Sequence, residues 1–108
     1  MTLNELCRSL NISRRAVQGY EAHGLVRPSG RTKHGYLLYD PAARERVAQI
    51  RRYQQYGFAL KEIGPLLEAP PARRKQQLEE RMQALLQTRT ELDNIITMLA
   101  NEIKQTED

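Results

Sequence analysis

A stretch without glycine or proline, from residue 72 to residue 103, constrains the fold of this chain more than any other feature. Leucine recurs in it every seven residues, and a second line of positions follows each leucine by four, which is the spacing of a four-heptad coiled coil. A long helix with so narrow an apolar stripe predicts self-association, and the alternative is packing against its own domain. The predicted dimerisation seam comprises Leu78, Met82, Leu85, Leu92, Ile96, Leu99 and Ile103, with Arg89 as a polar interruption.

The residues before this helix predict a separate head. Ala69-Pro70-Pro71 indicates a hinge, or the first turn of the helix that follows, because proline is tolerated at the start of a helix and not in its interior. We therefore expect a head domain over residues 1–68, a hinge over 69–75 and a dimerisation coiled coil over 76–104.

The charge of the chain is unevenly distributed. The formal net charge is +4. Residues 1–58 contain ten Lys or Arg and four acidic side chains, whereas residues 59–108 contain seven basic and nine acidic ones. A basic front half predicts that the front meets a polyanion, and the alternative is a solvated surface with chance clustering.

Two short helices joined by a tight turn are predicted for residues 4–10 and 14–23. The apolar residues of the first have the spacing of one buried face: Leu3, Leu6, Cys7 and Leu10. Ser13 is a favoured N-cap for the second helix, and Gly24 is a favoured residue just beyond its end. Two such helices form a helix-turn-helix pattern.

The second helix has two different sides. Val17 and Tyr20 fall on one of them, and Tyr20 either packs in the core or donates a hydrogen bond to a phosphate. Arg14, Arg15 and Gln18 project from the other. Arginine pairs with guanine and glutamine with adenine in the major groove, so we expect at least one of these three side chains to contact a base edge. The alternative is that the arginines contact only phosphate or solvent.

A small hairpin is predicted next, with residues 36–39 pairing back on residues 25–27. Its tip is basic and contains glycine, which permits close approach to a nucleic acid. We expect this wing to follow the DNA backbone or to enter the minor groove, and the alternative is a solvated loop tip. The candidate wing contacts are Arg31, Lys33, His34, Gly35 and Tyr36.

Two further helices complete the predicted head. Asp40 as N-cap and Pro41 in the first turn open the third, and Gly57 ends it. Its inner face is predicted to be Ala43, Val47, Ile50, and Tyr53 or Gln54. A fourth helix is expected from Leu60 to Leu67, with Leu60, Ile63 and Leu67 inward and a kink at Pro65. The predicted fold class is all-α with a small β-hairpin wing and a long C-terminal coiled-coil helix.

Composition excludes several classes of protein. No run of 18 apolar residues is present, so a membrane span is excluded, and the N-terminus lacks the apolar region of a signal peptide. One cysteine, Cys7, excludes a disulfide framework and a cysteine-rich metal site and fits a cytoplasmic location. Cys7 is expected to be a buried structural thiol. No constellation of catalytic residues and no cofactor or metal site is predicted, so we do not expect an enzyme.

Three motifs in this order resemble the MerR family of bacterial transcription regulators. They lie in residues 13–26, which contain Tyr20-Glu21 and Gly24-Leu25-Val26, in residues 35–40 and in residues 56–63, and the leucine seam follows them. The resemblance covers the whole chain. It implies a homodimer through an antiparallel coiled coil, double-stranded DNA with an inverted-repeat operator as partner, and RNA polymerase as a further candidate partner.

The chain departs from the family pattern at several positions. Gln18-Gly19 stands where members often carry Arg-Tyr, and Leu37 stands where they usually carry arginine. Both changes remove phosphate contacts that the family pattern implies, which leaves Arg14, Arg15, Arg31 and Lys33 to compensate. Ala59 replaces the usual Ser or Thr cap of the fourth helix.

The sequence predicts a sequence-specific transcription regulator of a short form. Only residues 105–108 follow the predicted coiled coil, so we expect no effector domain. Two other functions fit the same pattern: a coiled-coil adaptor for other proteins without a DNA role, and an architectural DNA-binding accessory factor.

Overall fold

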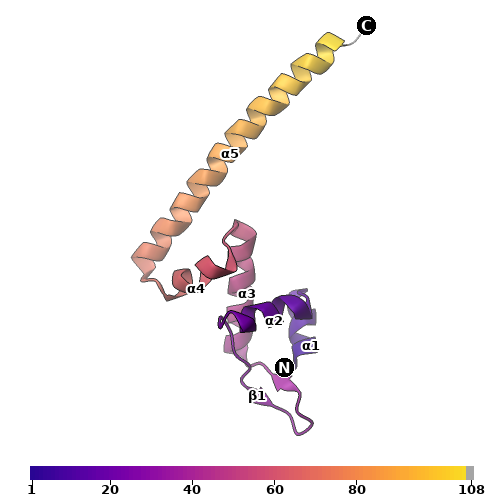
Figure 1. Cartoon of the computed structure of the whole chain (residues 1–108), viewed down its shortest axis with the longest axis vertical. Coiled ribbons are helices and arrows are strands. Elements are labelled where there is room, and N and C mark those ends of the chain that lie inside the picture. Colours follow the sequence, from indigo (N-terminus) through magenta and orange to yellow (C-terminus); the bar gives the residue numbers. More distant parts are fainter. Residues whose placement is uncertain (107–108) are drawn as a thin grey trace. The chain divides into compact units, whose positions relative to one another are not determined.

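The computed structural model of the chain describes residues 1–106. It contains five helices and one two-stranded antiparallel sheet, which confirms the predicted fold class (Figure 1). The elements in chain order are α1 (Leu3–Leu10), α2 (Arg14–Ala22), β1 (Gly30–Arg31), β2 (Leu37–Leu38), α3 (Pro41–Tyr56), α4 (Leu60–Glu68) and α5 (Pro71–Thr106). They form two compact units, the first spanning Met1–Glu68 and the second beginning at Ala69.

The long helix α5 begins earlier than the sequence predicted. Its first residue is Pro71, so residues 71–75, which were predicted to belong to the hinge, are helical. The carbonyl of Pro70 accepts a hydrogen bond from the Arg74 amide at 2.9 Å. Pro71 is tolerated because the first helical amides have no partner inside the helix, so no hydrogen bond is lost there.

Local capping sets the ends of the first two helices. Thr2 and Glu5 form a capping box at the start of α1, with Thr2 Oγ1 accepting from the Glu5 amide at 3.3 Å and the Glu5 carboxylate accepting from the Thr2 amide at 3.1 Å. Ser13 Oγ accepts from the Ala16 amide at 3.0 Å and opens α2 as predicted. Leu6 and Val17 are completely buried, one on each helix.

Helix α2 ends in a Schellman motif around Gly24. The Leu25 amide donates to the Tyr20 carbonyl at 3.0 Å, and the Gly24 amide donates to the Glu21 carbonyl at 2.9 Å. Gly24 has a φ of +71°, in the left-handed region that other residues occupy only at a cost. The motif turns the chain so that Leu25 and Val26 are buried.

Two glycines near α2 should respond oppositely to alanine. A Cβ at Gly19, inside the helix, meets no atom within 4 Å, so Gly19→Ala should raise the free energy of unfolding by up to about 1 kcal/mol through helix propensity. Gly24→Ala should lower it by about 1–2 kcal/mol because its φ is positive. Urea unfolding of both variants measures the two effects. The dependence of the free energy of unfolding on urea concentration should be the same as in the wild type, so that a shift of the midpoint reports stability. A loss of stability in Gly19→Ala would contradict the open space beside that position.

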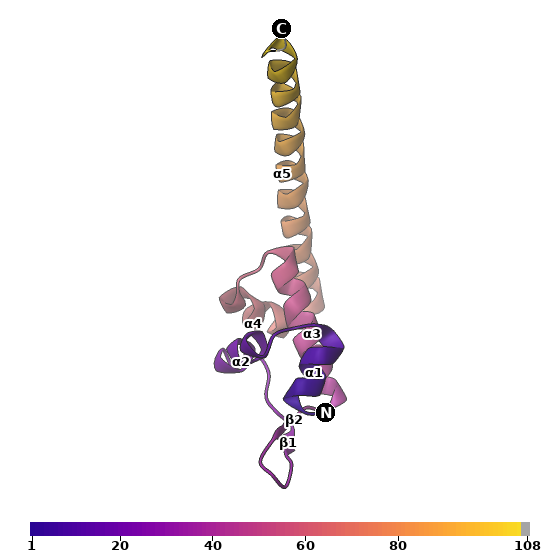
Figure 2. The same cartoon turned by 90° about the vertical axis from the view of Figure 1, so that its right-hand side faces the viewer.

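The hairpin pairs differently from the prediction. β2 pairs with β1, matching Gly30 to Leu38 and Arg31 to Leu37, and residues 25–27 take no part. Leu25 and Val26 are buried after the Schellman motif, so pairing begins only after Pro28. The other edge of β2 is also occupied, because Thr2 forms a bridge with Leu38. The N-terminus therefore lies beside the base of the hairpin (Figure 2).

Helices α3 and α4 supply much of the core. Asp40 caps α3, with its carboxylate accepting from the Ala43 amide at 2.8 Å, and Gly57 ends the helix, as predicted. The predicted inner face of α3 is confirmed: Ala43, Val47, Ile50 and Tyr53 are buried.

Helix α4 differs from the prediction in its inner face and in its cap. Ile63 and Leu66 are its buried residues, whereas Leu60 and Leu67, predicted inward, are only half-buried. Ala59 offers no side-chain cap, but the Glu62 carboxylate accepts the Ala59 amide at 3.0 Å and supplies half of a capping box. The helix continues through Pro65.

Candidate nucleic-acid interface

Helix α2 separates a buried side from an exposed polar side. Val17 is completely buried, and it anchors the helix in the core. Arg14, Arg15 and Gln18 are exposed, as the helical spacing predicted. The described part of the chain offers no hydrogen bond or ion pair to either arginine, so both guanidinium groups keep their donors for an external acceptor. This is the arrangement that a helix needs in order to enter a DNA groove.

Tyr20 belongs to the core rather than to this exposed side. Its side chain is 2% exposed, and its hydroxyl donates to Gln54 Oε1 on α3 at 2.6 Å. Burial raises the pKa of Tyr20, which keeps the phenol protonated as a donor. Of the two roles considered for Tyr20, the structure favours packing, because the hydroxyl proton is already used by Gln54.

The wing tip is a compact turn with basic side chains. The Gly35 amide donates to the Thr32 carbonyl at 3.0 Å, and the Thr32 amide donates to the Tyr36 carbonyl at 2.8 Å. Gly35 has a φ of +84°, which explains the glycine at this position. Arg31 donates to the Gly35 carbonyl at 3.0 Å, so this predicted DNA contact also holds the tip together. Lys33 and His34 are exposed at the turn.

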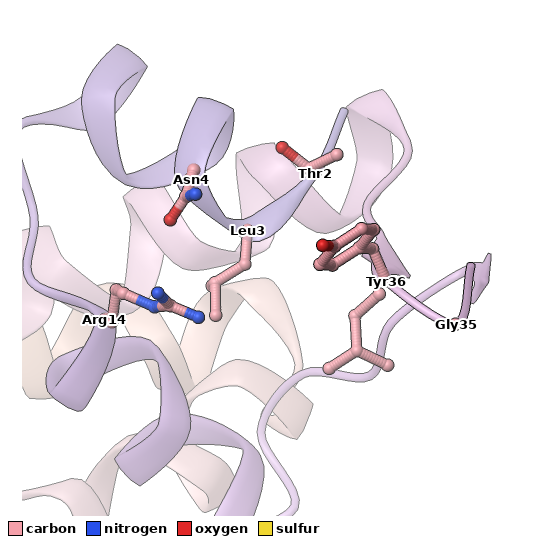
Figure 3. A pocket seen from close by; sticks show the side chains of 7 residues that line it. Thr2, Leu3, Asn4, Arg14, Gly35 and Tyr36 are labelled. Atoms are coloured by element: carbon pink, nitrogen blue, oxygen red, sulfur yellow. The ribbon is translucent and has the colours of Figure 1, made fainter. Parts of the chain in front are cut away.

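A pocket of about 400 Å³ lies between the start of α1, the start of α2 and the wing (Figure 3). Arg14 extends toward it from α2, and Tyr36, which is 66% exposed, lies across from it on the wing (Figure 3). The structure therefore brings Arg14 together with Gly35 and Tyr36, whereas Arg15 and Gln18 do not line the pocket. Its lining residues are Thr2, Leu3, Asn4, Arg14, Gly35, Tyr36 and Leu37.

A buried hydrogen bond connects α2 to the end of the wing. Tyr39 is 1% exposed, and its hydroxyl donates to the Glu21 carboxylate. Burial raises the pKa of Tyr39 and the bond to Glu21 raises it further, so the phenol stays a donor at neutral pH. Sequence reasoning missed this pair and also the Gln54 partner of Tyr20. Glu21 and Tyr39 lie in two of the motifs quoted above, and Gln54 was a candidate for the inner face of α3, but nothing in the sequence indicated either pairing.

Cys7 is not the fully buried thiol that was predicted. It is half-buried, because it lies at the edge of the inner face of α1 and not at its centre. Burial still raises the pKa of the Cys7 thiol, which disfavours the reactive thiolate. Among residues 1–106, no group of three His, Cys, Asp or Glu side chains is placed to hold a metal ion. No helix in the same range combines the length and apolarity needed to cross a bilayer.

Helix α5 exposes the predicted seam. None of its described residues is buried. Leu78 is half-buried, and the other predicted seam residues are between 45% and 62% exposed. Ile95 and Met98 add exposed apolar area that the prediction omitted, at 50% and 69%. Apolar side chains that recur from Leu78 to Ile103 leave an exposed stripe of the kind that typically packs against a partner.

Residues 1–70 match the family described as "MerR HTH family regulatory protein". The chain belongs to the MerR family. This confirms the resemblance found in the sequence motifs. The match spans the helix-turn-helix, the wing, α3 and α4, which are the elements that carry the exposed basic side chains described above.

Known MerR regulators resemble this chain in sequence and in structure. The HTH-type transcriptional activator mta of Bacillus subtilis (strain 168) is 34% identical over 85 residues, which cover 79% of this chain and 33% of mta. The chain thus spans a third of the length of that relative. The solved structure of MtaN, the N-terminus of the Bacillus subtilis multidrug transporter activator, superposes with a TM-score of 0.78 at 28% identity, covering 95% of this chain and 97% of MtaN.

A third comparison concerns a regulator with DNA present. HiNmlR, described as a MerR family regulator lacking the sensor domain and bound to promoter DNA, superposes with a TM-score of 0.68 over 95% of this chain and 86% of HiNmlR. Its sequence identity is 16%, so this likeness shows the fold alone. The relatives named here are transcriptional regulators and not enzymes.

Proposed function

We propose that the protein is a sequence-specific transcription regulator that binds an inverted-repeat operator in promoter DNA as a homodimer. The observation that carries the proposal is the division of α2 into a buried side and an exposed side with two unpaired arginines. In this proposal α2 enters the major groove, and the wing lies against the adjacent backbone. RNA polymerase is the further partner that a regulator bound at a promoter would meet.

The wing supports the proposal through its shape and charge. Lys33 and His34 are exposed at a tight turn that contains Gly35. Because glycine has no side chain to hold a ligand away, backbone phosphates can come near both basic side chains. The Tyr39–Glu21 hydrogen bond ties the end of the wing to α2, which would fix the spacing between the two DNA-contacting elements. Contacts from α2 and from the wing would then together fix the position of the head along the duplex.

An antiparallel coiled coil of α5 accounts for the whole seam in one register. When α5 is paired with an antiparallel copy about the midpoint of the seam, every seam residue except Leu92 meets another seam residue, and Leu92 meets Arg89. The pairs are Leu78 with Ile103, Met82 with Leu99, Leu85 with Ile96, and Arg89 with Leu92. A parallel dimer in register would place two Arg89 side chains opposite each other, and like charges at one seam position oppose association.

The charges beside the seam favour the same register. Arg81 and Glu102 flank the seam at equivalent heptad positions near opposite ends of α5. The antiparallel register places Arg81 of one copy near Glu102 of the other, at both ends of the coiled coil. The distance between the two α2 helices, and hence between half-sites, would be set by this coiled coil.

Selection from a random duplex pool tests the proposal. We expect the full chain to enrich an inverted repeat, and its binding to weaken steeply with salt because phosphate contacts release counterions. Enrichment of bent or flexible duplexes without an inverted repeat would indicate an architectural factor and contradict the proposal. Failure to bind duplex DNA at low salt would favour a protein-interaction adaptor.

A further inference from the structure

We propose that the pocket between α1, α2 and the wing holds one sugar–phosphate unit of the DNA backbone, with Arg14 as its phosphate anchor. This inference rests on the proposed DNA-binding function and deepens it. It assigns different roles to two adjacent arginines of α2: Arg14 would hold the backbone, and Arg15 would remain the candidate for reading bases. In the same proposal, the wing residue Leu37 contacts the sugar of that backbone unit.

The lining of the pocket matches the two halves of a nucleotide backbone. Leu3, Leu37 and the ring of Tyr36 provide apolar surface for the carbon atoms of a deoxyribose. Arg14 provides the cation at the same pocket and is the only basic side chain among the lining residues. A guanidinium group forms two parallel hydrogen bonds with a phosphate, which makes arginine suited to this role.

Two of the four polar side chains that line the pocket, Arg14 and Tyr36, keep free donors, whereas Thr2 is held by Glu5 in the capping box. Within residues 1–106, the Arg14 guanidinium group makes no hydrogen bond or ion pair, and the Tyr36 hydroxyl has no hydrogen-bond partner. Arg14 lies on α2 and Tyr36 on the wing, so a phosphate between them would touch both DNA-contacting elements (Figure 3). By contrast, Arg31 already donates to the Gly35 carbonyl, and Arg15 lies outside the pocket.

A substitution at Leu37 tests the proposal, because it can supply the positive charge of the pocket from the wing instead of from α2. Leu37 is half-buried on β2, in the wing, and lines the same pocket as Arg14. An arginine at position 37 would approach the same space from the wing. If a single phosphate occupies the pocket, Arg14→Leu removes its cation, and Leu37→Arg returns a cation to it.

The experiment measures duplex binding of the wild type, Arg14→Leu, Leu37→Arg and the double variant at several salt concentrations. Binding of the wild type is established first, so that failure of the DNA-binding function is recognised separately. We expect Arg14→Leu to weaken binding to the selected operator and to scrambled duplex by the same factor. We also expect it to lower the salt slope by about one unit per protomer. Leu37→Arg should restore both quantities in the Arg14→Leu background.

Uncharged methylphosphonate at single backbone positions provides the second readout. At one position per half-site, methylphosphonate should weaken binding of the wild type and leave binding of Arg14→Leu unchanged. In the double variant, methylphosphonate at that same position should weaken binding again. Arg15→Leu, one residue along the same helix, is the matched control and should keep the wild-type sensitivity. The proposal is overturned if Arg14→Leu changes the ratio of specific to scrambled binding, or if no backbone position loses its effect in that variant.

Discussion

Replacing Leu85 with aspartate is expected to convert the protein into monomers at micromolar concentration and to abolish operator binding. In the antiparallel register Leu85 meets Ile96 of the second copy, so the variant would place a charge in an apolar seam twice per dimer. Losing the burial of two leucine side chains alone removes about 3–6 kcal/mol, which weakens dimerisation more than about 100-fold. Analytical ultracentrifugation measures the dimer, and a gel-shift assay measures the loss of binding.

Leu92→Asp is the matched control for the direction of the two helices. It introduces the same charge at the same heptad position, but in the antiparallel register it faces Arg89 of the second copy. Its dimer should therefore be distinctly more stable than that of Leu85→Asp. Equal loss of the dimer in both variants would exclude this register, and a wild-type monomer at micromolar concentration would exclude the coiled coil itself.

The helices of the head could be predicted because their determinants are local. The Asp40 cap, Pro41 and the spacing of the α3 core residues each depend on positions no more than four residues apart. Leu66 was missed on α4 because a helix nine residues long has few turns to define its inner face. The choice between Leu66 and Leu67 therefore depends on the elements packed against α4.

The pairing of the wing could not be predicted from residues near the hairpin. Leu25 and Val26 have the β propensity of a strand, but burial after the Gly24 turn removes them from the ladder. The residue that occupies the outer edge of β2 is Thr2, 36 positions away from Leu38. Contacts of this separation are set by tertiary packing, which strand propensity does not report.

In the candidate site, too, local spacing predicts the exposure of side chains, whereas contacts between residues distant in sequence could not be predicted. The exposure of Arg15 and Gln18 follows from helical spacing alone, since Val17 and Tyr20 must face the core. The hydroxyl of Tyr20 finds Gln54, a residue 34 positions away, so its choice between core and phosphate was open until the helices were placed. Likewise, nothing in the sequence indicates that Arg14 and Leu37 line the same pocket.

The last prediction separates base reading by α2 from backbone contact by the wing tip. Arg15→Ala should weaken binding to the selected operator by about 1–3 kcal/mol per half-site and have little effect on scrambled duplex, because a lost arginine–guanine pair affects only the correct sequence. Lys33→Ala should weaken both duplexes by a similar factor and reduce the salt slope by about one unit per protomer.

The measurement is a matrix of wild type, Arg15→Ala and Lys33→Ala against operator and scrambled duplex at two or more salt concentrations. Both side chains are exposed, so neither substitution removes a buried contact, and unfolding in urea checks that the head stays folded. If Lys33→Ala changes the ratio of specific to scrambled binding and Arg15→Ala leaves it unchanged, the two elements have exchanged roles. The wing would then read the sequence in the minor groove, and α2 would serve as the backbone anchor.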